Sequence, residues 1–318
     1  MANLPVFFLH GAIGSAAHGI PFDQFAIEQR PVVHLNFAEN TASYQPLPDQ
    51  VQLAIQQIRN YTSNDSRFNN GYTIIAHSMG GVIARGVIEE MDDHNVKVLI
   101  TLGSSHSGVC HGPQADPSIT KQFGVELLNS HALPINLFDF SSYSNDAVQE
   151  GRMLVDLMEV MQKHPEITQN SSISSLLRYP VRKIWLDLKS YLSTIDNLQM
   201  DDAEHQRRKR NFLKLEELHA FTSPQDGILE PYQSGVFGYY TEVADSTELL
   251  AKYKTLEVVD LEDTVEYKEN SYGLRTLDER GGLFRYVVDQ VPHMCWVEDT
   301  GDCKVNDLVK AQLGPILK

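Results

Sequence analysis

The sequence predicts an α/β fold in which a mostly parallel central sheet carries helices on both of its faces. Two short, almost wholly apolar runs, at residues 4–10 and 31–37, have the length of buried strands. Between Pro46 and Tyr61 the apolar residues recur at helical spacing. Residues 72–91 then have the pattern of a strand, a tight turn and a helix, and residues 96–105 that of the next strand. This alternation is typical of parallel sheets covered by helices.

One domain with a long insertion accounts for the rest of the chain. The 318 residues are 42% apolar, which is enough to build one large core over residues 1–318. Between residues 113 and 210 the pattern is helical or loop-like, which predicts an insertion lying over the sheet. Strand patterns return at residues 212–223 and 282–291, and the acidic stretch from Glu242 to Asn270 between them is expected to be surface loop and helix.

The composition argues against two classes of partner. The formal net charge of −16 repels a polyanion such as a nucleic acid at long range. The one dense basic run, Arg207 to Arg210, is short, and we interpret it as a solvated loop or the start of a strand. No run of about 18 apolar residues is present, so the sequence predicts no membrane-spanning helix.

The three cysteines are too few for a disulfide scaffold. Cys295 and Cys303 are close enough in the sequence to close a small loop if the compartment is oxidising. Sequons at Asn60, Asn64 and Asn170 would accept glycans in a secreted or lysosomal protein. The N-terminus lacks the basic region, apolar stretch and small-residue cleavage site of a signal peptide, so we expect that peptide to be absent or already removed.

The strongest motif is the hexapeptide AHSMGG, from Ala76 to Gly81, which lies between an apolar strand and an apolar-periodic helix. This context is typical of a nucleophile elbow, a strained turn that needs small residues two positions before and after the serine. Ala76 and Gly80 meet that need, although Ala76 departs from the more common glycine. The motif therefore predicts an α/β-hydrolase fold with Ser78 as nucleophile. The alternative is a serine at an ordinary turn, bonded to the local backbone.

The other two members of a hydrolase triad are expected at the ends of later strands. A serine hydroxyl needs an imidazole to take its proton and a carboxylate to orient that imidazole, in the chain order serine, acid, histidine. Asp226 and His293 each follow one of the two later strands. Asp226 could instead be a turn former beside Gly227, and His293 an ordinary histidine. The weaker candidates are Asp260, Asp263 and Glu230 for the acid, and His205 and His219 for the base.

The oxyanion of a tetrahedral intermediate also needs preorganised donors. These are usually the amide of the residue after the serine and an amide in the turn after an early strand. Here they are the backbone N–H groups of Met79 and Ala12, and His10 and Gly11 fit such a turn. We expect this chemistry to need no metal ion and no organic cofactor.

Several segments, taken in order, resemble the palmitoyl-protein thioesterase family over nearly the whole chain apart from the insertion. FFLHGAIGS resembles the family's first strand and oxyanion turn, AHSMGG its nucleophile segment, and VLITLGSSHSGV the strand and loop that follow. The most specific stretches are RKRNFLKLEELHAFTSPQDGILEPYQSGVFGYY and YGLRTLDERGGLFRYVVDQVPHMCW, which resemble the acid loop, an aromatic segment and the histidine loop. The likeness is greater to the second type of this family than to the first.

The resemblance implies that Ser78 is the nucleophile, Asp226 the orienting acid and His293 the general base, in agreement with the motifs. It also implies a fatty-acyl, in particular palmitoyl, thioester as substrate, carried by a lipidated protein or by coenzyme A, and a lysosomal or secreted location. One departure is Met79, where the family usually has glutamine. Since the oxyanion donor is a backbone amide, this change preserves the donor and alters the wall of the pocket.

Two other functions are weighed against this one. A lipase or carboxylesterase acting on oxygen esters uses the same three residue types, whereas a non-catalytic binding module predicts the loss of Ser78 or His293, and both are present. In the insertion, one apolar helix could line an acyl-binding groove, because methionine side chains adapt to irregular apolar ligands. It could equally well pack on the sheet. Its apolar residues are Met153, Leu154, Leu157, Met158 and Met161.

Overall fold

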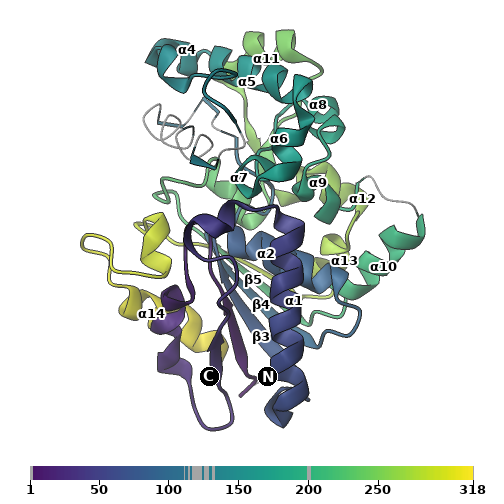
Figure 1. The fold of residues 1–318 in the computed structure, drawn as a ribbon, viewed down its shortest axis with the longest axis vertical. Coiled ribbons are helices and arrows are strands. Elements are labelled where there is room, and N and C mark those ends of the chain that lie inside the picture. Colours follow the sequence, from purple (N-terminus) through teal and green to yellow (C-terminus); the bar gives the residue numbers. More distant parts are fainter. Residues whose placement is uncertain are drawn as a thin grey trace.

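The core of the protein is a six-stranded sheet in the order β2-β1-β3-β4-β5-β8, and all five neighbouring pairs are parallel (Figure 1). The computed structural model describes residues 3–110, 112–113, 115–116, 124, 129–130, 133–198 and 202–317. The strands are β1 (Val6–Leu9), β2 (Val32–His34), β3 (Tyr72–His77), β4 (Val96–Leu102), β5 (Glu217–Thr222) and β8 (Leu283–Val287). The predicted α/β fold with a mostly parallel sheet is confirmed.

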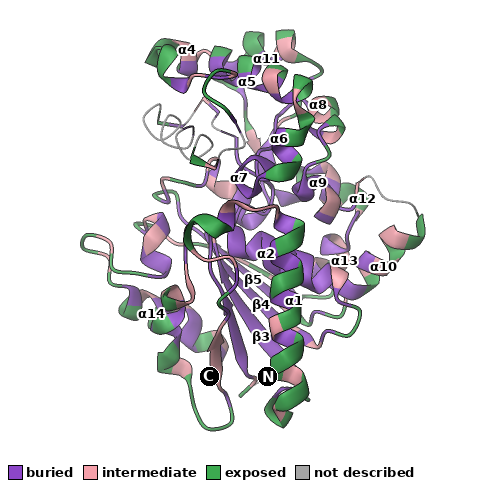
Figure 2. Ribbon diagram, viewed as in Figure 1, coloured by how far each residue is buried: buried purple, intermediate pink, exposed green. Residues whose placement is uncertain are grey.

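The central strands bury side chains on both faces of the sheet, because successive side chains point to opposite sides. In β1, Phe7 and Leu9 belong to the core beneath α1 (Leu47–Asn64) and α2 (Met79–Glu90). Val6 and Phe8 belong to the opposite core, which α14 (Val305–Leu317) covers. Figure 2 shows β3, β4 and β5 mostly buried and α1 exposing its outer side.

A cap of short helices stands over the carboxyl ends of the strands and contains two insertions rather than one (Figure 1). The first lies between β4 and β5, within the range that the sequence predicted, and part of that range falls outside the described residues. Its helices are α4 (Asn145–Gln149), α5 (Arg152–Lys163), α6 (Pro165–Asn170), α7 (Ser172–Ser175), α8 (Arg182–Asp187), α9 (Tyr191–Ile195) and α10 (Asp202–Phe212).

The second insertion lies between β5 and β8, and its helix α11 packs against α5 of the first. It consists of the antiparallel strands β6 (Tyr239–Tyr240) and β7 (Val258–Val259) and the helices α11 (Ser246–Lys252), α12 (Val265–Glu269) and α13 (Leu274–Glu279). The described chain also contains segments of 3-10 helix, which are η1 (Ala16–Phe25), η2 (Asn40–Tyr44), η3 (Ser66–Phe68), η4 (Phe140–Ser142), η5 (Tyr232–Val236), η6 (Tyr253–Thr255), η7 (Leu261–Asp263) and η8 (His293–Trp296).

A fully buried arginine ties the cap to the helix that follows the nucleophile turn. Arg85 of α2 donates to the Asp196 carboxylate at 3.0 Å and to the Ile195 carbonyl at 3.0 Å, both at the end of α9. Its guanidinium also lies 4.2 Å from the centre of the Tyr272 ring, in the second insertion. One side chain therefore contacts the sheet layer and both insertions, and a buried cation is stable only with such partners.

The basic run Arg207 to Arg210 is not the solvated loop or strand start that the sequence suggested. It lies in α10, where Arg208 is buried and donates to Glu89 of α2 at 3.0 Å. The sequence pattern could not reveal this, because the partner lies 119 residues away in the chain.

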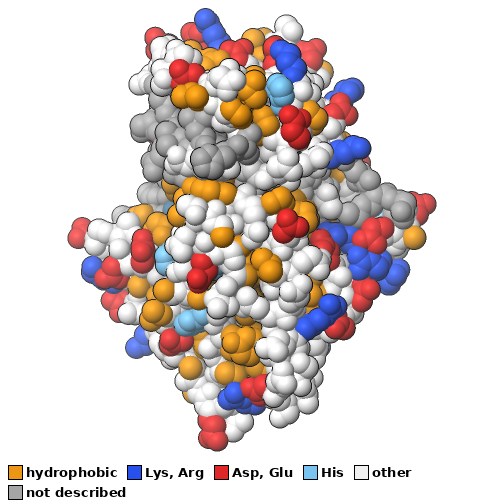
Figure 3. Space-filling model, in the orientation of Figure 1, with side chains coloured by type: hydrophobic (Ala, Val, Ile, Leu, Met, Phe, Trp, Pro, Cys, Tyr) orange, Lys and Arg blue, Asp and Glu red, His pale blue; other side chains and the backbone are white. Residues whose placement is uncertain are grey.

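The surface carries charges of both signs. On the face drawn in Figure 3, acidic and basic side chains are interspersed with hydrophobic ones. In the described part of the chain, no helix is both long and apolar enough to cross a membrane.

Arg85→Met should lower the free energy of unfolding by about 3–5 kcal/mol, because it leaves buried carboxylates without their partner. The matched control is Arg59→Met, which breaks an exposed pair with Asp93 (N–O distance 2.6 Å) and should change stability by less than about 1 kcal/mol. Urea unfolding of the two variants measures both values. Equal losses would show that burial of the Arg85 cluster does not matter for stability.

Candidate active site

Ser78 occupies a strained turn at the junction of β3 and α2. Its backbone angles are φ 56° and ψ −129°, a conformation that a non-glycine residue rarely adopts outside functional turns. The turn fits because Gly80 has no side chain: a Cβ atom there would lie 2.6 Å from the carbonyl oxygens of both Leu9 and His10. The predicted need for a small residue two positions after the serine is thus explained by the backbone of β1.

Ser78, His293 and Asp226 form one hydrogen-bonded chain. His293 Nε2 lies 2.9 Å from Ser78 Oγ, and His293 Nδ1 lies 2.8 Å and 2.9 Å from the two carboxylate oxygens of Asp226. A carboxylate only accepts hydrogen bonds, so the histidine proton is on Nδ1 and Nε2 is left as the acceptor for the serine hydroxyl. This arrangement can remove the proton of Ser78 as its oxygen attacks a carbonyl carbon.

The Asp226 carboxylate is buried and held in place by its own loop. Its Oδ1 accepts from the amides of Ile228 at 3.1 Å and Leu229 at 2.7 Å. The amide of His293 donates to the Asp226 carbonyl at 2.9 Å, which joins the loop after β5 to the loop after β8. Asp226 does form the turn beside Gly227 that was the alternative to a role as the acid. That turn orients the carboxylate toward His293.

The weaker candidates lie elsewhere: in the described chain, none of them hydrogen bonds to Ser78 or His293. Asp260 and Asp263 pair with Arg285 and Lys268, His219 pairs with Glu217 on β5, and His205 lies on α10. Glu230 is partly buried, and burial, together with the nearby charge of Asp226, raises the pKa of its carboxyl to about 7.

The two amides expected to hold an oxyanion both border the cavity beside Ser78. Ala12 lies in the turn after β1, and Met79 is the first residue of α2. Neither amide donates a hydrogen bond within the described part of the chain. The turn that contains Ala12 is fixed by the next amide, of Ile13, which donates to Ser43 Oγ at 2.7 Å. Both donors are therefore available beside the serine hydroxyl.

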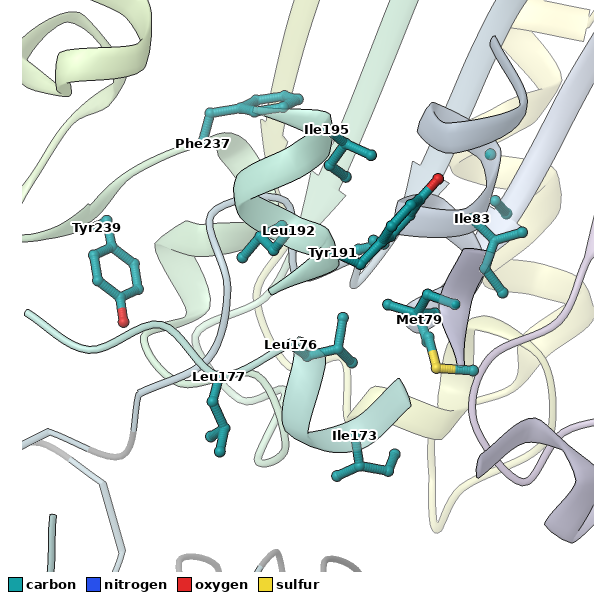
Figure 4. Close-up of a cluster of buried hydrophobic side chains, with 14 of the residues drawn as sticks. Met79, Ile83, Ile173, Leu176, Leu177, Tyr191, Leu192, Ile195, Phe237 and Tyr239 are labelled. Carbon is teal, nitrogen blue, oxygen red and sulfur yellow. The ribbon is translucent and has the colours of Figure 1, made fainter. Parts of the chain in front are cut away.

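An apolar cavity of about 300 Å³ opens at Ser78. The cap contributes Ile173 and Leu176 to its wall, and Figure 4 shows these two side chains on the same side as Met79, with Leu177 pointing away. The remaining apolar wall is formed by Ala12, Ile13, Val109, Ile228, Leu229 and Met294. None of the five α5 side chains that the sequence offered as a groove wall borders this cavity; they are buried in the core of the cap.

Two histidines beside the cavity were not predicted from the sequence. His77 is the last residue of β3, and His18 lies in η1. The position of His77 directly before the nucleophile was the one signal that could have drawn attention to it. Among the described residues, no group of three or more His, Cys, Asp or Glu side chains could hold a metal ion.

A disulfide follows the histidine loop. Cys295 and Cys303 are bonded, as their spacing allowed, and Cys295 is fully buried two residues after His293. The bond joins the start of this loop to the segment that leads into α14. The histidine loop is thus restrained after His293 by this disulfide, and β8 lies before it in the chain.

Comparison with known proteins identifies the family of this chain. A family model described as palmitoyl protein thioesterase matches residues 5–293, which include Ser78, Asp226 and His293. The chain belongs to the palmitoyl protein thioesterase family. It is accordingly an acyl thioester hydrolase, as expected from the resemblance, and the oxygen-ester alternative is not favoured.

Relatives of this thioesterase extend over most of its length. It is 29% identical to lysosomal thioesterase PPT2-B of Xenopus laevis over 298 residues, which cover 92% of this chain and 87% of the relative. It is 26% identical to lysosomal thioesterase PPT2 of Homo sapiens, over 92% of this chain and 82% of the relative. Among solved structures, the mature Bacillus licheniformis lipase BlEst2 has a TM-score of 0.47 at 14% identity, covering 100% and 93% of the two chains.

Gly103→Ala in this thioesterase should lower kcat by about 10-fold or more, because a 1 Å displacement near reacting groups is costly. The new Cβ would lie 3.0 Å from Asp226 Oδ2 and 3.4 Å from His293 Nδ1, at a backbone φ of 56°. The control is Gly281→Ala, which has the same kind of backbone (φ 78°) and no atom within 4 Å of the new Cβ. Both variants should lose stability, and only Gly103→Ala should lose kcat; an equal kcat in the two would contradict this reasoning.

Proposed function

We propose that this enzyme cleaves long-chain fatty-acyl thioesters through an acyl-serine intermediate, with Ser78 as nucleophile, His293 as general base and Asp226 as the group that orients the base. The observation that carries the proposal is the bridging position of His293, whose two ring nitrogens lie 2.8–2.9 Å from Asp226 and Ser78. Burial of Asp226 and its two amide donors supports the orienting role.

The reaction has two steps. Ser78 Oγ attacks the thioester carbonyl carbon while its proton passes to His293 Nε2, and the resulting oxyanion accepts hydrogen bonds from the amides of Ala12 and Met79. The carbon–sulfur bond then breaks, the sulfur takes the proton from His293 and leaves as a thiol, and the acyl group stays on Ser78. Water attacks this ester and gives its proton to His293, and the fatty acid leaves as Ser78 Oγ takes a proton back from His293.

We assign the acyl chain to the apolar cavity under the cap. Its wall of Ile173, Leu176, Val109 and Leu229 favours a hydrocarbon chain, since each buried methylene stabilises binding by about 0.8 kcal/mol. The insertion over residues 113–210 thus contributes to an acyl-binding groove through α7 and the residue that follows it. The thiol portion belongs to a lipidated protein or to coenzyme A.

We propose a lysosomal or secreted location. The relatives from Xenopus laevis and Homo sapiens are both named lysosomal thioesterases. The bonded pair Cys295 and Cys303 supports an oxidising route of synthesis, because disulfides are rare in reducing compartments. The sequons at Asn60, Asn64 and Asn170 have exposed asparagines, as glycosylation on that route requires.

Ser78→Ala should abolish turnover of palmitoyl thioesters, with a loss of at least about 10³-fold, because it removes the hydroxyl on which the proposed acyl intermediate forms. The measurement is thiol release from palmitoyl-coenzyme A and from a palmitoylated peptide, beside matched oxygen esters. Preference between the two thioesters identifies the carrier of the acyl group. Full activity of Ser78→Ala would show that Ser78 is not the nucleophile. If the wild-type enzyme turned over only oxygen esters, the esterase alternative would be correct.

Leu176→Ala should reduce kcat/KM for long-chain thioesters on the order of 10-fold and leave acetyl thioesters nearly unchanged, since it removes apolar contacts along the chain. The control is Leu177→Ala, a neighbour that is equally buried (5% exposed against 6%) and does not border the cavity. Both variants lose a similar buried volume, so only a change of chain-length preference separates them. If both variants showed the same chain-length preference, the assignment of the acyl chain to this cavity would be wrong.

A further inference from the structure

His77 lies directly against the base of the proposed triad and has no part in the mechanism above. It is the last residue of β3, its side chain is 2% exposed, and its ring centre lies 4.8 Å from that of His293 at a tilt of 45°. Its Nε2 lies 3.0 Å from the backbone carbonyl oxygen of His293. One buried imidazole thus contacts the histidine 216 residues farther along the chain.

The protonation state of His77 follows from its contacts. A carbonyl oxygen can only accept, so Nε2 must carry a proton and donate it. Nδ1 is buried and has no hydrogen-bond partner among the described residues, so a second proton there would be an unsatisfied buried donor. Burial, and next the neighbouring His293, hold the pKa of His77 well below its usual value. His77 is therefore a neutral imidazole with a single donor, aimed at the His293 backbone.

The backbone of His293 is held at both of its polar groups. Its amide donates to the Asp226 carbonyl at 2.9 Å, and its carbonyl accepts from His77 Nε2. These contacts tie the histidine loop to the acid on one side and to the strand that carries Ser78 on the other. His77 and Ser78 are consecutive residues, so any shift of this strand moves the donor and the nucleophile together.

We propose that His77 is a positioning residue for the thioesterase reaction: its Nε2–H fixes the His293 backbone so that the imidazole stays within hydrogen-bond reach of Ser78 Oγ. This role rests on the proposed function, since it acts through His293 as the base. The distance that His77 maintains in this proposal is the 2.9 Å between His293 Nε2 and Ser78 Oγ. Proton transfer depends on that distance, whereas acyl binding depends on the cavity wall, so the role predicts an effect on kcat rather than on KM.

Two substitutions distinguish the effect of the His77 N–H donor from the effect of its aromatic ring. His77→Phe keeps an aromatic ring beside His293 and removes the N–H group, whereas His77→Gln keeps a side-chain N–H donor and removes the ring. We expect His77→Phe to lower kcat by about 10- to 100-fold with KM changed less than about 3-fold, in line with the sensitivity of catalysis to a 1 Å misplacement. His77→Gln should recover most of the lost kcat. The rate of Ser78 labelling by a fluorophosphonate, which needs the same base, should follow the same order.

Thermal unfolding of each variant shows that the compared proteins are folded, and the comparison is made on the folded enzyme. Wild-type kcat in His77→Phe would overturn the proposal, and so would equal losses in His77→Phe and His77→Gln, because the ring rather than the donor would then matter. Ser78→Ala is measured in parallel. If Ser78→Ala keeps its activity, the proposed function fails; if it is inactive while His77→Phe is fully active, only the role of His77 fails.

Discussion

The site depends on one tight contact between the turn after β3 and the backbone of β1. Ser78 can take its strained conformation only because the start of α2 approaches the carbonyls of Leu9 and His10, and that approach leaves no room for a side chain at Gly80. Ala12 and Met79, whose amides are the proposed oxyanion donors, line the same cavity as Ser78. The parallel pairing of β1 and β3 therefore brings together Ser78, the proposed nucleophile, and the turn that carries the proposed oxyanion donor Ala12.

A network of buried charges decides how the cap sits on this unit. Arg85 and Arg208 link α2 to α9 and α10, and Arg178, which lies beyond α7, pairs with Glu266 of the second insertion at 3.1 Å. Buried ion pairs contribute little net stability compared with apolar packing, but a mispaired charge is strongly unfavourable. The network therefore selects one placement of the cap, and with it the position of Ile173 and Leu176 over Ser78.

The sequence predicted the sheet and the helix after Ser78, and it named the three residues that the structure joins in one hydrogen-bonded chain. Parallel strands and strand-end loops leave local patterns of this kind, as at Asp226 and His293. The burial of Arg208 and the contact of His77 with the His293 carbonyl depend on partners more than 100 residues away, which no local pattern encodes. The apolar spacing of α5 was equally consistent with a groove and a core, and the described cavity excludes its side chains.

The chain order of the site has a consequence for synthesis on the ribosome. Ser78 and His293 are 215 residues apart, which at about 5–20 residues per second corresponds to roughly 10–40 s of translation. During that interval the serine turn and its oxyanion amides can form, but the imidazole that would activate them does not yet exist. β8, whose end carries the histidine loop, pairs only with β5 at the edge of the sheet. A nascent chain that ends before His293 lacks the proposed base, so under the proposed mechanism it cannot attack acyl groups.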